Sequence, residues 1–100
     1  MAAQLRIYNL HPDTWQEFAR KVNEEIVPIR LDHGFRLDGP WLVEETCQYV
    51  WIVHYDGDLS FAEAEERYEA DPRWAELSFD PMDYIAGEDL RMLTPQPRPF

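Results

Sequence analysis

The chain of 100 residues contains few of the residue types on which several classes of protein depend. Its one cysteine, Cys47, excludes an internal disulfide and a thiolate metal cluster. It carries 9 lysines and arginines against 20 aspartates and glutamates, for a formal net charge of −11. Because nucleic acids and anionic membranes bind clustered cationic side chains, we expect neither as a partner. There is also no glycine-rich phosphate loop, and no stretch approaches the ~20 apolar residues of a membrane span.

The composition is that of one folded domain. Apolar residues make up 45% of the chain and aromatic residues 14%, which excludes a disordered chain. We assign residues 1–94 to a single domain, and residues 95–100 to a proline-rich, extended C-terminal tail. The first ten residues lack the basic segment and continuous apolar run of a secretory signal peptide, so we expect a cytoplasmic protein.

The apolar pattern is strongest in a predicted hairpin over residues 35–57. Side chains of its second strand alternate between two sets, one of Tyr49, Trp51, Val53 and Tyr55, the other of Val50, Ile52 and His54. A strand with one solvated face has one polar set, whereas both sets here are mostly apolar. Helices of the same chain can cover one face of this sheet. We therefore expect a second copy of the chain on the other face, in a homodimer.

Helix signals flank the hairpin. A T-x-x-E capping box at Thr14 predicts a helix start, and Pro28 predicts a kink before the helix ends at Gly34. A second box, Ser60 with Glu63, starts another helix. Strands are predicted over residues 4–10 and 85–93, with a bulge near Gly87. The order βαββαβ predicts an α+β, ferredoxin-like antiparallel sheet with strand order 4-1-3-2 and both helices on one face.

Three segments carry a resemblance to a known family. They read LRIYNLHPDTWQEF, EEIVPIRLDHGFRLDGPW, and QYVWIVHYDG followed by FAEAEERYEADPRWAEL. Their order and spacing resemble NIPSNAP-like proteins over roughly residues 4–93. The resemblance implies the dimeric α/β-barrel group, in which two such sheets pack face to face. That group includes antibiotic-biosynthesis monooxygenases that need no cofactor, and haem-degrading monooxygenases.

The resemblance and the histidine pattern both bear on cofactors. The haem-degrading branch carries a histidine ligand on its second helix, and residues 61–77 contain none, although Asn9 matches that branch's asparagine on the first strand. His11, His33 and His54 show no spacing typical of a metal site. We therefore expect no metal and no cofactor.

Five residues are candidates for a site between the sheet and the helices. We interpret His54 and Tyr8 as catalytic candidates, a proton acceptor and an oxyanion stabiliser on adjacent central strands. Arg6, Arg36 and Trp51 are candidates for substrate binding. The structural alternatives stay open: a core histidine, a core tyrosine ring, arginines paired with acidic neighbours, and a buried tryptophan anchor.

Two functional hypotheses follow. In the first, the protein binds a small hydrophobic or aromatic molecule, and acts on it as a monooxygenase-like enzyme without a cofactor. In the second, it is a non-catalytic dimeric binding or interaction module. The first requires an apolar cavity with converging polar groups, and the second expects that space to be filled by side chains.

Overall fold

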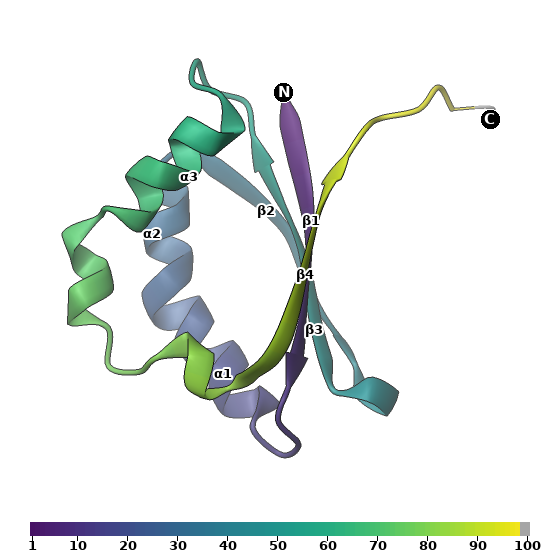
Figure 1. Cartoon of the computed structure of the whole chain (residues 1–100), viewed down its shortest axis with the longest axis vertical. Helices are drawn as coiled ribbons and strands as arrows, with labels where there is room; N and C mark the ends of the chain where they lie inside the picture. The colour runs from purple at the N-terminus through teal and green to yellow at the C-terminus, as the bar shows by residue number, and fades with distance from the viewer. Residues whose placement is uncertain (99–100) are drawn as a thin grey trace.

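The fold is a four-stranded antiparallel sheet with helices against one face, as a computed structural model describes it for residues 1–98 (Figure 1). The strands are β1 (Ala2–Leu10), β2 (Phe35–Val43), β3 (Gln48–Tyr55) and β4 (Ile85–Leu93). They lie in the order β2-β3-β1-β4, so that β1 and β3 are central. This confirms the predicted ferredoxin-like α+β fold and its strand order.

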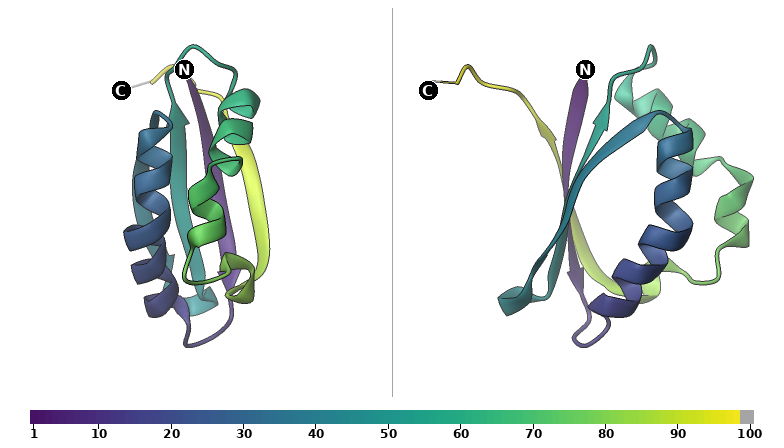
Figure 2. Two further views of the ribbon diagram at one scale, coloured as in Figure 1. Left: turned by 90° about the vertical axis from the view of Figure 1, so that its left-hand side faces the viewer. Right: turned by 180° about the vertical axis from the view of Figure 1, so that it is seen from behind.

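The helices lie side by side on one face of the sheet (Figure 2). The connection from β1 to β2 contains α1 (Trp15–Lys21), the π-helical segment η1 (Val22–Ile26) and α2 (Val27–Asp32). The connection from β3 to β4 contains α3 (Phe61–Glu69) and the short 3₁₀ turns η3 (Pro72–Glu76) and η4 (Pro81–Asp83). A further turn, η2 (Glu44–Thr46), joins β2 to β3. None of the described helices is long and apolar enough to cross a membrane.

Pro28 interrupts the first helical segment, but at a different place from the predicted kink. The irregular part lies before the proline, where the Val27 amide donates to the carbonyl oxygen of Val22, five residues back. Pro28 itself falls in the first turn of α2. A proline at this position has no amide hydrogen to donate to the preceding turn, and its ring crowds the carbonyl oxygens of that turn. The wider π turn therefore absorbs the proline without ending the helix.

The two predicted capping boxes have different outcomes. Ser60 accepts a hydrogen bond from the amide of Glu63 at 3.1 Å, and its hydroxyl donates to the Glu63 side chain at 3.0 Å. This box is confirmed. At Thr14 the helix begins where predicted, but the box does not form, because the hydroxyl donates to the carbonyl oxygen of His11 at 2.6 Å and makes no capping bond to α1. Thr14 closes the turn before the helix instead.

The two faces of the sheet differ in cover. The face against the helices, here called the inner face, holds the buried side chains of β3, which are Tyr49, Trp51, Val53 and Tyr55. The opposite, uncovered face holds Val50, Ile52 and His54, all half-buried. Residues paired across neighbouring strands share a face, so β1 adds Leu5 and Ile7 to the uncovered face. The core therefore lies entirely between the sheet and the helices.

A bulge in β2 turns one large aromatic side chain outward. The pairing of β2 with β3 shifts by one residue between Asp38 and Trp41, where Gly39 and Pro40 interrupt the ladder. Strict alternation from Phe35 would place Trp41 on the inner face. After the shift Trp41 pairs with Val50, and it lies 53% exposed on the uncovered face.

The last strand and the tail bear on two further predictions. The pairing of β1 with β4 shifts between Asn9 and Leu10, next to Gly87, as the predicted bulge required. Residues 94–98 have no regular secondary structure. From the sequence we also expect the apolar Phe100 to reach a partner subunit, but this residue lies outside the described residues.

We predict that Gly34→Ala lowers the free energy of unfolding by about 1 kcal/mol, because Gly34 ends α2 at a φ of +84°. Chemical denaturation measures this loss. A Cβ atom at Gly34 would be 3.6 Å from Tyr55, an ordinary contact, so the backbone conformation alone accounts for the loss.

Gly87→Ala is the matched control. Its added Cβ atom would also find its nearest neighbour at 3.6 Å, at the Asn9 side chain, but without a positive φ. We expect a change within about 0.5 kcal/mol there. Equal losses in the two variants would contradict the explanation.

Candidate functional site

A cavity of about 520 Å³ lies between the inner face of the sheet and the helices. Its walls come from β1, β3 and β4, from the helices, and from the segment that follows α3. Six of the lining side chains are aromatic: Tyr8, Phe18, Trp51, Tyr68, Trp74 and Phe79. A concave, mostly apolar space with a few polar groups is the usual form of a small-molecule site.

Three charged side chains meet at the wall of this cavity. Arg30 of α2 donates through both terminal nitrogens to the two carboxylate oxygens of Glu65 on α3, with 3.5 Å from Nη2 to Oε2. Arg6 of β1 approaches the same carboxylate, with 3.5 Å from Nη1 to Oε2. One acidic side chain therefore joins two helices and a central strand.

Aromatic rings enclose Arg30. Its guanidinium carbon lies 3.8 Å from the centre of the Tyr68 ring and 4.7 Å from that of Phe35. Only 2% of the side chain is exposed. A planar guanidinium suits both the stacking and the two-point contact with Glu65, which an ammonium group would not reproduce.

Arg6 is held less completely than Arg30. Its Nε and Nη1 are buried and have no hydrogen-bond acceptor within residues 1–98. Burial opposes its charged form, but Tyr8 and Glu65 outweigh that effect, so the pKa of Arg6 is raised. The group is therefore a permanent positive charge with open donors.

Tyr8 and Trp51 form a polar contact within the aromatic wall. The indole Nε1 donates to the Tyr8 hydroxyl at 3.2 Å, and both side chains are buried. The Tyr8 ring stacks on Tyr49 and meets Phe18 edge-on. Burial raises the pKa of the hydroxyls of Tyr49 and Tyr68, so both stay neutral at physiological pH. Of the five predicted site residues, the structure brings together Arg6, Tyr8 and Trp51.

His54 does not reach this cavity, so the prediction that it shares a pocket with Tyr8 is wrong. Its Nε2 lies 2.6 Å from a carboxylate oxygen of Asp38, on the uncovered face. The reason is the alternation of β3, since an even-numbered residue there points away from Trp51 and Tyr55. His54 pairs with Ala3, whereas Tyr8 pairs with Tyr49, five residues before His54 along β3.

Arg36 and Asn9 also lie away from the cavity. Arg36, on the edge strand β2, is 55% exposed and donates to Asp56 at 3.3 Å, which corrects its place in the predicted site. It is an arginine paired with an acidic neighbour, which is one of the structural alternatives from the sequence. Asn9, the match to the haem-degrading branch, lies on the uncovered face and accepts a hydrogen bond from Gln48 at 2.9 Å.

An ion-pair network anchors the segment after α3 that closes one side of the cavity. Asp71 accepts from Arg73, and it lies 2.8 Å from Nε2 of His33 at the end of α2. The hydrogen bonds from Arg73, then that from His33, hold the pKa of Asp71 well below its usual range. This contact ties η3, and with it Trp74, to the first helical segment.

Sequence reasoning missed Arg30 and Glu65, although a signal was present. Arg30 follows Ile26 by four residues on the apolar stripe of its helix, and Glu65 adjoins the inward-facing Ala64. Charges of opposite sign on two inward helix stripes indicate a buried pair. Among residues 1–98, no group of three or more histidine, cysteine or acidic side chains is arranged to hold a metal ion.

We predict that Glu65→Gln lowers the free energy of unfolding by about 3 kcal/mol, because it leaves two buried arginines without their shared carboxylate. Thermal and denaturant unfolding at pH 7 measure the loss. Glu66→Gln, one residue further on the exposed side of α3, is the matched control, with an expected change within about 0.5 kcal/mol. Similar losses in both variants would disprove a structural role for the pair.

Comparisons with known proteins agree with this fold. A NIPSNAP domain protein of Burkholderia xenovorans is 24% identical, with a TM-score of 0.83 over 96% of this chain and 95% of that chain. A NIPSNAP family protein of unknown function from Agrobacterium tumefaciens is 24% identical, with a TM-score of 0.81 over 95% and 87%. A putative antibiotic biosynthesis monooxygenase from Bacteroides thetaiotaomicron is 21% identical, with a TM-score of 0.69 over 99% and 92%.

Comparison by sequence gives the family directly. Among curated proteins, no sequence matches the chain. The NIPSNAP family, in contrast, matches residues 3–98, nearly the whole chain. With the resemblance of its motifs and the shared fold, the match is decisive: the chain belongs to the NIPSNAP family.

Proposed function

We propose that the protein binds a small, largely aromatic compound in the cavity between the sheet and the helices. The aromatic lining of that cavity, with Arg6 and Glu65 converging on it, is the observation that carries the proposal. Rings in the wall offer flat apolar surface to a flat ligand, and the few charged groups give it one orientation. The first hypothesis from the sequence required such a cavity.

A monooxygenase-like reaction on the bound compound is the second candidate function. The fold shared with a putative antibiotic biosynthesis monooxygenase favours it, together with the Tyr8 hydroxyl in the cavity wall. This candidate function needs a proton acceptor in the cavity, and neither of the two candidates is suited to that role. His54 faces away, and the Glu65 oxygens already accept from Arg30 and attract Arg6. A carboxylate held by two cations is a poor base, so we place binding first.

The binding proposal predicts that a neutral aromatic probe enters the cavity and that a bulkier wall excludes it. We expect calorimetry to show binding of 2-naphthamide to the wild-type chain. Leu77→Trp, which adds an indole to the cavity wall, should weaken that binding at least about tenfold. Leu31→Trp adds the same group on the exposed side of α2 and should leave it unchanged. Equal affinities in the two variants would place the probe elsewhere.

The active form in this proposal is a homodimer that pairs the uncovered faces of two sheets. An apolar stripe runs across that face through Leu5, Ile7, Trp41, Val50 and Ile52. Trp41 is 53% exposed, and no helix of the described chain covers the stripe (Figure 1). Two such faces packed together would bury it as in a β-sandwich.

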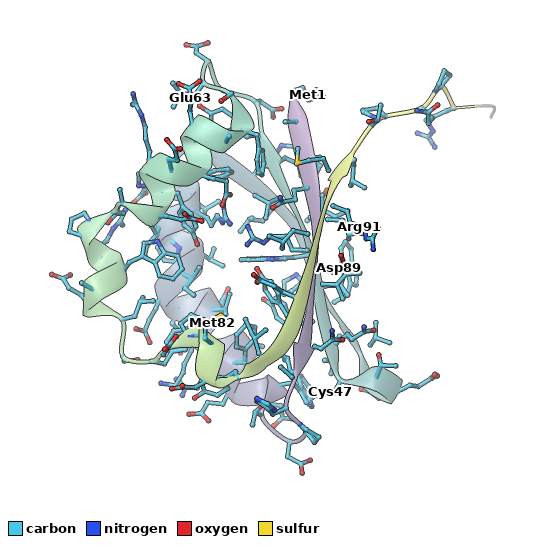
Figure 3. All side chains as sticks on the ribbon, in the orientation of Figure 1. Met1, Cys47, Glu63, Met82, Asp89 and Arg91 are labelled. Atoms are coloured by element: carbon cyan, nitrogen blue, oxygen red, sulfur yellow. The ribbon has the colours of Figure 1, made fainter. Side chains whose placement is uncertain are left out.

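The charge of the uncovered face supports a second copy as its partner. At a net charge of −11, two copies repel each other, and a neutral contact surface avoids adding close repulsion at the interface. On this face Arg36 and Arg91 offset Asp38 and Asp89, which leaves a formal charge of zero. Asp89 and Arg91 project from β4 on the side away from the helices and pair at 3.1 Å (Figure 3).

The cytoplasmic location stays a prediction from the sequence.

We predict that Ile52→Asp separates the dimer, because it buries a charge at the centre of the proposed contact. Light scattering at micromolar concentration should give twice the 11.9 kDa chain mass for the wild type and the chain mass for the variant. Leu31→Asp, on the exposed side of α2, should stay dimeric. A wild-type protein at the mass of one chain would reject the assembly.

A further inference from the structure

The cavity wall carries an uneven charge. Two guanidinium groups, of Arg6 and Arg30, share the single carboxylate of Glu65. The sum of these three charges is +1, although the whole chain carries −11. An excess positive charge within this buried cluster is costly unless an anion lies beside it, since the low dielectric strengthens both the penalty and the attraction.

The excess positive charge belongs to Arg6. Arg30 has both carboxylate oxygens as acceptors and two aromatic rings against its guanidinium faces. Arg6 has one approach to Glu65 at 3.5 Å, and its Nε and Nη1 find no hydrogen-bond acceptor in the described chain. The side chain of Arg6 is only 12% exposed. Arg6 lines the cavity, with Nε and Nη1 beneath the surface of its wall, so a ligand meets these donors when the guanidinium turns toward it.

The rim of the cavity restricts which anion can enter. Glu69, Asp80 and Glu88 also line it, one each from α3, the start of η4 and β4. These three carboxylates repel a ligand with several negative charges, such as a phosphate ester. A ligand with one anionic group meets less electrostatic repulsion from these carboxylates, and the aromatic walls contact its apolar part.

We propose that the cavity selects an aromatic compound carrying a single carboxylate, and that Arg6 binds that carboxylate. The planar fork of a guanidinium matches a carboxylate in a two-point contact, which would supply acceptors for the donors that Arg6 leaves open. The inference rests on the proposed function and adds the chemical class of its ligand. It gives Arg6 the role of ligand recognition and Arg30 that of holding Glu65 in place.

The test compares two probes of one shape that differ in charge, 2-naphthoate and 2-naphthamide. Calorimetry at pH 7 with the full chain should show at least about tenfold tighter binding of the naphthoate, a difference of about 1.4 kcal/mol. In Arg6→Gln we expect the preference to vanish, because both probes then meet a neutral side chain. Arg6→Lys keeps the charge but loses the fork, so a reduced preference is expected.

Arg20→Gln is the matched control, since the Arg20 side chain lies on α1, 57% exposed, away from both the cavity and the uncovered face. It should keep the full preference. Thermal melts check folding, and we expect Arg6→Gln to fold because the pair of Arg30 with Glu65 stays intact. If Arg6→Gln does not fold, the preference of the wild type for the naphthoate and its reduction in Arg6→Lys test the proposal instead.

The outcomes separate this inference from the proposed function. Equal binding of both probes by the wild type would overturn the carboxylate preference and leave the aromatic cavity standing. A preference that survives in Arg6→Gln would overturn the assignment to Arg6. If neither probe binds, the proposed function and this inference both fail.

Discussion

The contact on which the rest of the structure depends is the pair between Arg30 and Glu65. It joins α2 to α3 above the sheet, with Arg6 of β1 drawn to the same carboxylate. A buried ion pair of this kind contributes less to stability than its charges suggest, because both groups lose their water. The main contribution of this pair is to the geometry of the fold. It fixes the positions of two helices over one strand, and so fixes the width of the cavity beside them.

The two faces of the sheet differ in chemistry, and we relate each to a different kind of partner. The inner face combines aromatic rings with a positive charge, and we relate it to a ligand. The uncovered face combines an apolar stripe with charges that offset one another, and we relate it to a second copy. Because strand side chains alternate, neighbouring residues such as Trp51 and Ile52 serve different faces from one backbone. A change on one face therefore leaves the chemistry of the other largely intact.

The sequence predicts the fold well and the site only in part. Period-two patterns and the Ser60 box locate the strands and α3, since these signals depend on near neighbours. Placing Tyr8 and His54 in one pocket failed, although the alternation of β3 already separates His54 from Trp51. The inward stripes of the two helices mark Arg30 and Glu65 as buried, but their pairing across 35 residues depends on how the helices pack, which no local pattern specifies. The capping box predicted at Thr14 does not form for a local reason, because the Thr14 hydroxyl closes the preceding turn.

The bulge in β2 has a consequence for how such a protein can change over evolutionary time. One extra residue around Gly39 and Pro40 decides that Trp41 faces outward. Losing or gaining a residue there would exchange the faces of every position between the bulge and Val43 on this edge strand. The central strands, which carry Arg6, Tyr8 and Trp51, would keep their register. A single insertion or deletion in this lineage would thus alter the surface proposed for a second copy, while the cavity between sheet and helices is inherited unchanged.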